Sequence, residues 1–200
     1  MTVEEWADLP DDVRGELVNG QLVEEEMADF VHEAVLVYLL CCLREWAVRR
    51  DGRVYGSEGK FALGPRHGRK PDLSVFLNGR RPVAEGAAFA PPDFMVEVIS
   101  PRPRDARRDR IEKAVEYAAF GVRQYWLVDP RLRTLEILVL GKRGRYELAL
   151  GASSGKLDRV PGCPGLSLDL DAMWAEIAEL SRRPAAPKPR RPARRSRRRA

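Results

Sequence analysis

Two carboxylates and one lysine are the residues of this sequence most suited to chemistry. Asp72 lies in the segment KPDLSVF (70–76), and Glu97 lies in DFMVEVIS (93–100). Each acid falls inside an apolar run that is typical of a buried strand, where an unpaired charge is costly unless it binds a cation. Lys113 follows on the next expected helix. This set of residues predicts a divalent-metal site that cleaves phosphodiesters.

The segments around these residues predict alternating helices and strands. A short helix is expected at 3–9, with Thr2 as its N-cap in a capping-box pattern. Asn19-Gly20 favours a type I′ turn, so 15–25 is expected to be a hairpin. The other expected helices are about 29–50, 105–120 and 172–180, and the other expected strands are 53–55, 60–63, the two acid segments, 123–130, 134–140 and 144–150. This order predicts an α/β (α+β) fold around one sheet.

The long helix at about 29–50 is expected to begin at Asp29 and to end at Asp51-Gly52. Helical spacing indicates one apolar face, which would carry Phe30, Ala34, Val37, Cys41 and Trp46. We expect this face to pack on the sheet.

Composition indicates one folded domain, 1–180, and a tail, 181–200. Hydrophobic residues make up 44% of the 200 residues, enough for a packed core. No run of eighteen apolar residues is present, so no membrane contact is expected. The N-terminus has no apolar stretch of the signal-peptide type, and three cysteines are too few for a disulfide framework. A cytoplasmic location with reduced thiols is expected, and a chain with two histidines and no Cys-x-x-Cys motif is not expected to bind zinc.

The tail determines the sign of the net charge. Residues 181–200 contain ten Lys and Arg residues and no acid, which leaves 25 basic against 30 acidic residues in the remainder. The tail has almost no apolar side chain larger than alanine, so we expect it to be disordered. It either binds nucleic acid through phosphate contacts or reflects compositional drift.

The ordered motifs resemble the Uma-type restriction endonuclease family of the PD-(D/E)XK nuclease superfamily. The resemblance covers about residues 10–175, and the matching segments are GELVNGQLV, Pro71-Asp72, EVISP (97–101), Lys113 with Tyr117, and GVRQYWLVDP (121–130). It implies a restriction endonuclease-like mixed sheet flanked by helices, an endonuclease activity on DNA, and two copies that can pair.

The resemblance also implies a mechanism. Asp72 and Glu97 would bind Mg²⁺ or Mn²⁺, with the backbone carbonyl of Val98 as a third ligand. Lys113 would orient the attacking water and stabilise negative charge in the transition state.

The lysine departs from the superfamily pattern. Ile99 stands two positions after Glu97, where lysine is usual, so the resemblance moves the lysine to position 113. Asp109 lies four residues before Lys113 and can pair with it, which would either position the ammonium or make Lys113 a surface ion pair. Lys70, beside Pro71-Asp72, is the alternative catalytic lysine.

Further residues are expected near the site. Glu16, His32 and Asp109 are candidates for contacts behind the metal ligands, although Glu16 can equally be solvated and His32 can be an ordinary helix histidine. Arg104, Arg107 and Arg108, with Arg102 and Arg110, are candidates for nucleic-acid binding at the start of the Lys113 helix.

Two other classes of function stay open. One is a nucleic-acid-binding module that has the nuclease fold without cleavage. The other is a structural or oligomerising protein in which Asp72 and Glu97 form buried ion pairs with arginine.

Overall fold

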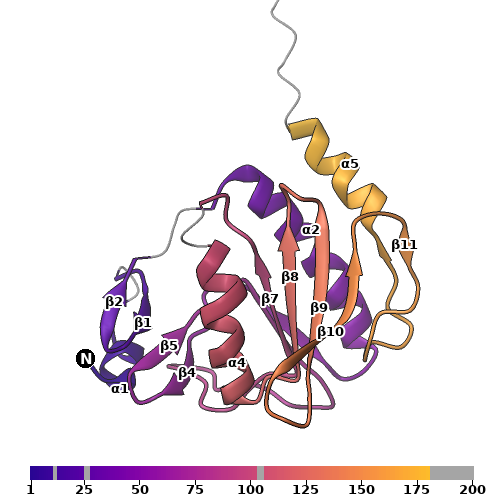
Figure 1. Cartoon of the computed structure of the whole chain (residues 1–200). Helices are drawn as coiled ribbons and strands as arrows, with labels where there is room; N and C mark the ends of the chain where they lie inside the picture. The colour runs from indigo at the N-terminus through magenta and orange to yellow at the C-terminus, as the bar shows by residue number, and fades with distance from the viewer. Residues whose placement is uncertain (11–12, 25–27, 103–105, 181–200) are drawn as a thin grey trace, which may run out of the picture.

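The computed structural model describes residues 1–10, 13–24, 28–102 and 106–180, and a six-stranded mixed sheet lies at its centre (Figure 1). The strand order is β10-β9-β8-β7-β6-β3, in which β7 and β8 are parallel and the other neighbours are antiparallel. The strands are β3 (Arg53–Tyr55), β6 (Leu73–Phe76), β7 (Phe94–Val98), β8 (Gln124–Asp129), β9 (Thr134–Leu140) and β10 (Tyr146–Ala152). The predicted α/β fold with a mixed sheet is confirmed.

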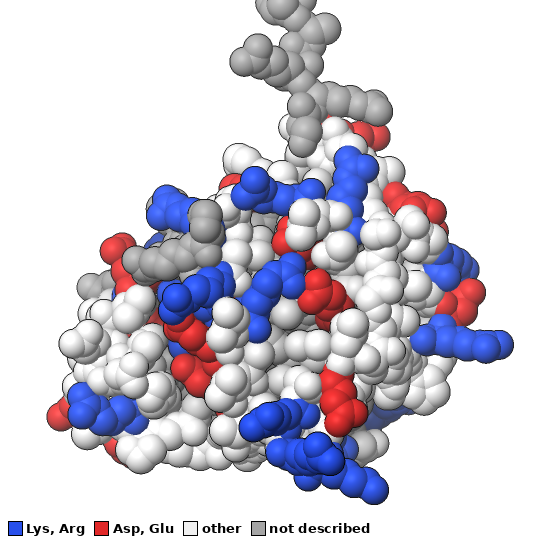
Figure 2. Space-filling model, viewed as in Figure 1, with Lys and Arg blue, Asp and Glu red and all other residues white. Residues whose placement is uncertain are grey.

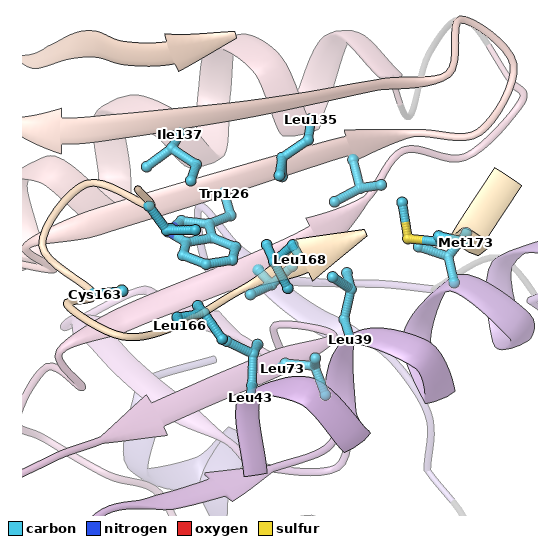
Figure 3. Close-up of a cluster of buried hydrophobic side chains, with 14 of the residues drawn as sticks. Leu39, Leu43, Leu73, Trp126, Leu135, Ile137, Cys163, Leu166, Leu168 and Met173 are labelled. Atoms are coloured by element: carbon cyan, nitrogen blue, oxygen red, sulfur yellow. The ribbon is translucent and has the colours of Figure 1, made fainter. Parts of the chain in front are cut away.

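Side chains alternate across this sheet and so build a core on each face. On β7, Phe94, Val96 and Val98 pack with α2 (Phe30–Val48) and α5 (Leu170–Leu180). Figure 3 shows part of this core, in which Leu39 and Leu43 from α2 lie near Leu73 of the sheet, and Trp126 belongs to the same cluster. On the opposite face, Met95 packs with Tyr117 of α4 (Ala114–Phe120). Glu97 comes two residues after Met95 on β7, so its side chain points to the same face, toward α4.

The apolar face predicted for α2 is wrong for Phe30, Val37 and Cys41, whereas Trp46 is buried and Ala34 packs against the core as expected. Phe30 and Val37 are 85% and 52% exposed, whereas the buried residues are Val35, Leu39, Leu43, Trp46 and Ala47. Most positions between 30 and 43 are apolar, so hydrophobic spacing alone does not distinguish the faces of this helix. The predicted beginning is confirmed, because Asp29 caps α2 by accepting the backbone N–H of His32 at 2.8 Å.

A smaller antiparallel sheet with α1 (Val3–Ala7) forms the N-terminal part of the fold (Figure 1). Its order is β2-β1-β5-β4, from β1 (Glu16–Val18), β2 (Gln21–Val23), β4 (Phe61–Gly64) and β5 (His67–Arg69). The hairpin is confirmed, with Asn19 and Gly20 at φ +52° and +79°. The sequence did not predict β5, where Gly68 permits the ring of Trp6 to lie against the backbone, since a Cβ would come within 2.4 Å of it.

The helix that carries Lys113 is irregular. The prediction was one helix over 105–120, but the segment η1 (Arg108–Lys113) is π-helical and only then continues as α4. Residue 105 lies outside the described part of the chain. Gly121 ends α4 at φ +93°, as its position predicts. Single π-helical turns occur often at functional sites, because one extra residue turns the side chains around it.

The C-terminal part contains a two-stranded ladder, β11 (Lys156–Leu157) with β12 (Leu168–Asp169), and α5. None of the helices in the described residues is long and apolar enough to cross a membrane. The tail 181–200 lies outside the described residues, so its disorder and the domain boundary stay predictions.

Candidate functional site

Asp72 and Glu97 lie on adjacent strands at one edge of the central sheet. Asp72 directly precedes β6 rather than lying within it, and Glu97 is the fourth residue of β7. Leu73 pairs with Val96, so one further step of this antiparallel register places Asp72 opposite Glu97. Both acids line a cleft of about 380 Å³. The two carboxylates therefore share one cavity.

Asp72 is held by a backbone amide and a histidine. Its Oδ2 accepts the N–H of Val98 at 2.7 Å and lies 3.1 Å from Nε2 of His32. Burial lowers the pKa of His32, but the hydrogen bond and the charge of Asp72 outweigh burial and raise the pKa overall. The start of α2 thus supplies a contact to the Asp72 carboxylate.

Glu97 is buried and has two partners on the helix that covers it. Its Oε1 accepts the hydroxyl of Tyr117 at 2.7 Å and lies 3.0 Å from Nζ of Lys113. Burial raises the pKa of Glu97 well above its ordinary value, although Lys113 opposes the shift. An additional positive charge beside Glu97 would favour its ionised form.

Lys113 lies within the protein among three carboxylates. Its side chain is 6% exposed, and Nζ lies 3.0 Å from Glu97, 3.3 Å from Asp109 and 3.5 Å from Glu16. Burial lowers the pKa of the ammonium, but Glu16, Glu97 and Asp109 together raise it well above its ordinary value. The geometry does not fit the alternative in which Lys113 is a surface ion pair.

Glu16 joins this cluster through a buried network that sequence reasoning missed. Its side chain is 1% exposed, and its Oε2 accepts a 2.7 Å bond from Arg69, which is itself fully buried. Arg69 also binds Glu116 of α4 through two nitrogens, at 2.6 and 2.9 Å. Burial raises the pKa of Glu16, but Lys113 and Arg69 lower it overall. Arg69 thus connects the small sheet to α4 beneath the cleft.

Asp109 is also buried, and a tyrosine holds its backbone. The hydroxyl of Tyr125 donates to the carbonyl of Asp109 at 2.9 Å, from β8 to the π-helical turn. Burial raises the pKa of the Asp109 carboxyl, with Lys113 opposing the shift. The bond from Tyr125 fixes the turn that places Asp109 and Lys113 together.

Lys70 lines the same cleft but has a different ionic partner. Its ammonium lies 2.8 Å from the exposed carboxylate of Glu58, and its backbone N–H donates to Glu16 at 3.1 Å. Of the two lysine candidates, Lys113 is the one whose ammonium contacts Glu97.

The arginines proposed for nucleic-acid binding have differing positions. Arg108 lines the cleft, whereas Arg107 is exposed and pairs with Glu112 at 3.0 Å. Arg110 does not fit a basic face, because its guanidinium is bound by Glu136 and Asp129. Arg104 lies outside the described residues. Figure 2 shows blue and red side chains interleaved on the face that carries α4.

The donor set fits a hard divalent cation that keeps part of its water shell. In the described ranges, no group of three or more His, Cys, Asp or Glu side chains is arranged as a metal cage. Two carboxylates remain, with the carbonyl of Val98, which points to the same side of β7 as the N–H that binds Asp72. Mg²⁺ is commonly bound by one or two carboxylates plus substrate phosphate, so Asp72 and Glu97 suffice.

Tyr117, Tyr125 and Arg69 were not predicted to contact the site. Tyr117 stands four residues after Lys113, and this spacing on a helix could have indicated that both reach Glu97. Arg69 carried no such signal, because β5 was not predicted and its partner Glu116 is remote in sequence.

The fold and the site together define a restriction endonuclease-like protein, with two acids on adjacent strands and a lysine on the covering helix. The chain belongs to the Uma2 family, described as "Putative restriction endonuclease", whose model matches residues 3–171. It is similar to a solved structure from Anabaena variabilis, described as "a putative nuclease belonging to DUF820", with 19% identity and a TM-score of 0.70 over 88% of this chain and 99% of that one. No curated protein matches the chain. The predicted family and restriction endonuclease-like fold are confirmed.

Proposed function

We propose that the protein is a metal-dependent endonuclease that hydrolyses phosphodiester bonds in DNA. The observation that carries the proposal is the buried ammonium of Lys113, which lies 3.0 Å from Glu97 in a cleft that Asp72 also lines. A purely structural ion pair would not require a second acid in the same cavity. Membership of the Uma2 family supports nuclease chemistry in general.

Asp72, Glu97 and the carbonyl of Val98 would hold Mg²⁺ or Mn²⁺. When bound, such an ion neutralises phosphate charge and lowers the pKa of a water molecule beside the scissile bond. His32 and the Val98 N–H hold the Asp72 carboxylate, and Tyr117 holds Glu97, so both acids are fixed before substrate arrives. Fixed ligands of this kind lose little freedom on binding.

Lys113 would act as a hydrogen-bond donor. Its pKa is raised by the surrounding acids, so the side chain is an ammonium at neutral pH and cannot accept a proton. The ammonium would orient the attacking water and stabilise the negative charge that develops on the phosphate. In this hydrolysis the water oxygen bonds to phosphorus while one P–O bond breaks, which leaves a phosphate on one end and a hydroxyl on the other.

An assay of plasmid nicking with Mg²⁺ or Mn²⁺ tests the proposal. Asp72→Asn, Glu97→Gln and Lys113→Met should each lower the cleavage rate by at least about 100-fold, since each removes a group of the reacting centre. Arg49→Gln, an exposed substitution far from the cleft, is the control and should retain full activity. Circular dichroism would establish that all variants are folded.

The same assay distinguishes the alternatives. Lys70→Met should keep most of the activity. If Lys70→Met is inactive and Lys113→Met is active, the catalytic lysine is at position 70. Wild-type protein that neither binds the ion nor nicks DNA would instead favour a catalytically silent nucleic-acid-binding or oligomerising module.

A further inference from the structure

The turn between β8 and β9 presents two arginines at the edge of the sheet that carries the site. Arg131, Leu132 and Arg133 are all exposed, Leu132 to 66%. The Oδ1 of Asp129 accepts the N–H groups of Arg131 and Leu132 at 3.0 Å each, so the turn is held in place. β7 and β8 run parallel, and the turn therefore lies at the same edge as the end of β7.

A second cavity, of about 520 Å³, lies beside this turn and adjoins the catalytic cleft. Arg131 and Arg133 line it on one side, and Val31 and Ile177 give it an apolar wall. His32 lines both this cavity and the cleft, so one side chain separates the two spaces. A linear molecule that leaves the cleft past His32 would enter the second cavity.

The charges of this cavity favour an anion. Asp29 is the one carboxylate among its described lining residues, against two guanidinium groups. Arg131 donates to the carbonyl of Pro101 at 2.9 Å and has further N–H donors, since a guanidinium carries five. In the described part of the chain, Arg133 pairs with no acid.

The most basic segment of the sequence follows α5, and α5 itself lines the same cavity. Ala178 of α5 lines the cavity, and the segment with ten Lys and Arg residues and no acid starts three residues later, at Ser181. Figure 2 also shows Lys and Arg side chains along the upper rim, where β8 and β9 meet in Figure 1. Within the described residues, the positive charge of this edge comes from Arg131 and Arg133.

We propose that this cavity, named here the Arg131–Arg133 groove, binds the phosphate backbone of the DNA strand that leaves the catalytic cleft. Arg131 and Arg133 would bind phosphates, and the wall of Val31 and Ile177 would contact sugar or base. The inference rests on the proposed function, because it takes DNA as the substrate. Beyond that function, the inference gives the path of the DNA strand, which would run from Asp72 past His32 to the β8–β9 turn.

Binding of a fluorescein-labelled 30-base-pair duplex, measured by fluorescence anisotropy, tests the groove separately from cleavage. The measurement uses the full chain with Glu97→Gln and no metal, so the duplex stays intact. Adding Arg131→Gln and Arg133→Gln should weaken binding about 5–10-fold at 0.1 M salt. It should also reduce the slope of log affinity against log salt by about 1–2, because each phosphate contact contributes about 0.9.

A matched control exists at the other end of β9. Arg143 and Arg145 lie on the exposed turn that leads into β10, so Arg143→Gln with Arg145→Gln removes the same charge far from the groove. This pair should change affinity less than 2-fold. Equal losses from both pairs, or no loss from the Arg131 and Arg133 pair, would overturn the proposal.

A second measurement does not depend on the turn remaining folded. With the exposed Cys41 replaced by serine, Ala178→Cys carrying a photoactivatable crosslinker should couple to the duplex, whereas Glu147→Cys on β10 should not. Coupling at neither position, or equally at both, would contradict the groove. A protein that couples through Ala178 but never cleaves DNA would retain this inference and refute the proposed nuclease activity.

Discussion

At the scale of single residues, the site is an excess of carboxylates around one buried ammonium. Glu16, Glu97 and Asp109 all contact Lys113, and Asp72 lines the same cleft. Only part of this negative charge is balanced by Lys113, and Glu97 is left with a raised pKa. Such a cluster is unfavourable without a further cation. The free energy of unfolding of the protein should therefore depend on pH and on bound metal.

Glu97→Gln should stabilise the metal-free protein at neutral pH. The folded-state pKa of Glu97 is raised above its ordinary value of 4.5. Between 4.5 and the raised pKa, the folded protein keeps a proton that the unfolded chain has released, so wild-type stability falls as pH rises through this window. Glutamine has no such proton. Urea unfolding with EDTA should show similar stabilities at pH 4 and a more stable variant at pH 8.

Exposed Glu179→Gln is the control and should follow the wild type at both pH values. A Glu97→Gln variant that is less stable at pH 8 would mean that the ion pair with Lys113 outweighs burial of the carboxylate.

Arg69→Met should destabilise the fold by about 3–5 kcal/mol, because it leaves the buried carboxylate of Glu16 without its guanidinium partner. Arg69 is fully buried and bonds Glu16 at 2.7 Å. Arg49→Met, which breaks the exposed pair with Glu45, should cost less than about 1 kcal/mol. Chemical denaturation measures both. Similar small losses for both variants would show that Glu16 does not depend on Arg69.

At the scale of elements, the ends of helices and strands position the site. The start of α2 holds Asp72 through His32, the π-helical turn η1 places Asp109 beside Lys113, and β6 and β7 present the two acids. None of these elements contributes more than a few side chains. A local change at one element end should therefore affect the site more than the fold.

Asp29→Ala should lower cleavage while leaving the protein folded. The substitution removes the N-cap of α2, at a cost of about 1 kcal/mol, and loosens His32, whose N–H the cap binds. Thr2→Ala removes the cap of α1 for a similar cost but lies away from the cleft, so it should keep full activity. Asp29→Asn keeps a capping oxygen and should restore cleavage. Equal nicking rates for all three variants would contradict the role of the α2 start.

Local sequence rules predicted most elements because their signals lie within a few residues. The Asn19-Gly20 turn, the Asp29 cap and the Gly121 helix end are all present. Such rules failed where contacts with residues distant in the sequence determine which face of a helix is buried or whether a strand forms. The face of α2 depends on the sheet beneath it, and β5 depends on the packing of Trp6 against Gly68.

The candidate site followed the same division. Asp72 and Glu97 could each be predicted from a short motif, because the residues of a motif lie close together in the sequence. Both acids line the same cleft. The bond from Arg69 to Glu116 joins residues 47 apart, and the π-helical turn arises inside a segment that reads as an ordinary helix. Neither could be read from a local pattern.

At the scale of the whole molecule, charge is divided between the folded part and the tail. Residues 1–180 hold 25 basic and 30 acidic residues, whereas 181–200 hold ten basic and none acidic. A folded part with excess acid repels DNA at long range, so a basic tail would supply affinity without sequence specificity.

Deleting residues 182–200 should weaken DNA binding and flatten its salt dependence. If all ten cations contacted phosphates, the salt slope would fall by up to about 9, which sets the upper limit. Folding and the rate of cleavage at saturating DNA should not change, because the tail contains none of the proposed ligands. Anisotropy at several salt concentrations measures the slope, and an unchanged slope, or an unfolded truncation, would contradict this role.

A crystal soaked in Mn²⁺ would show whether Asp72 and Glu97 hold a metal ion, because the anomalous signal locates the ion without reference to activity. We expect one Mn²⁺ bound by Asp72, Glu97 and the carbonyl of Val98, with the Lys113 ammonium beside it. Two results would contradict the metal site on which the proposed nuclease depends. One is an ion bound elsewhere, and the other is a crystal without an anomalous peak in which Glu97 contacts only Lys113 and Tyr117.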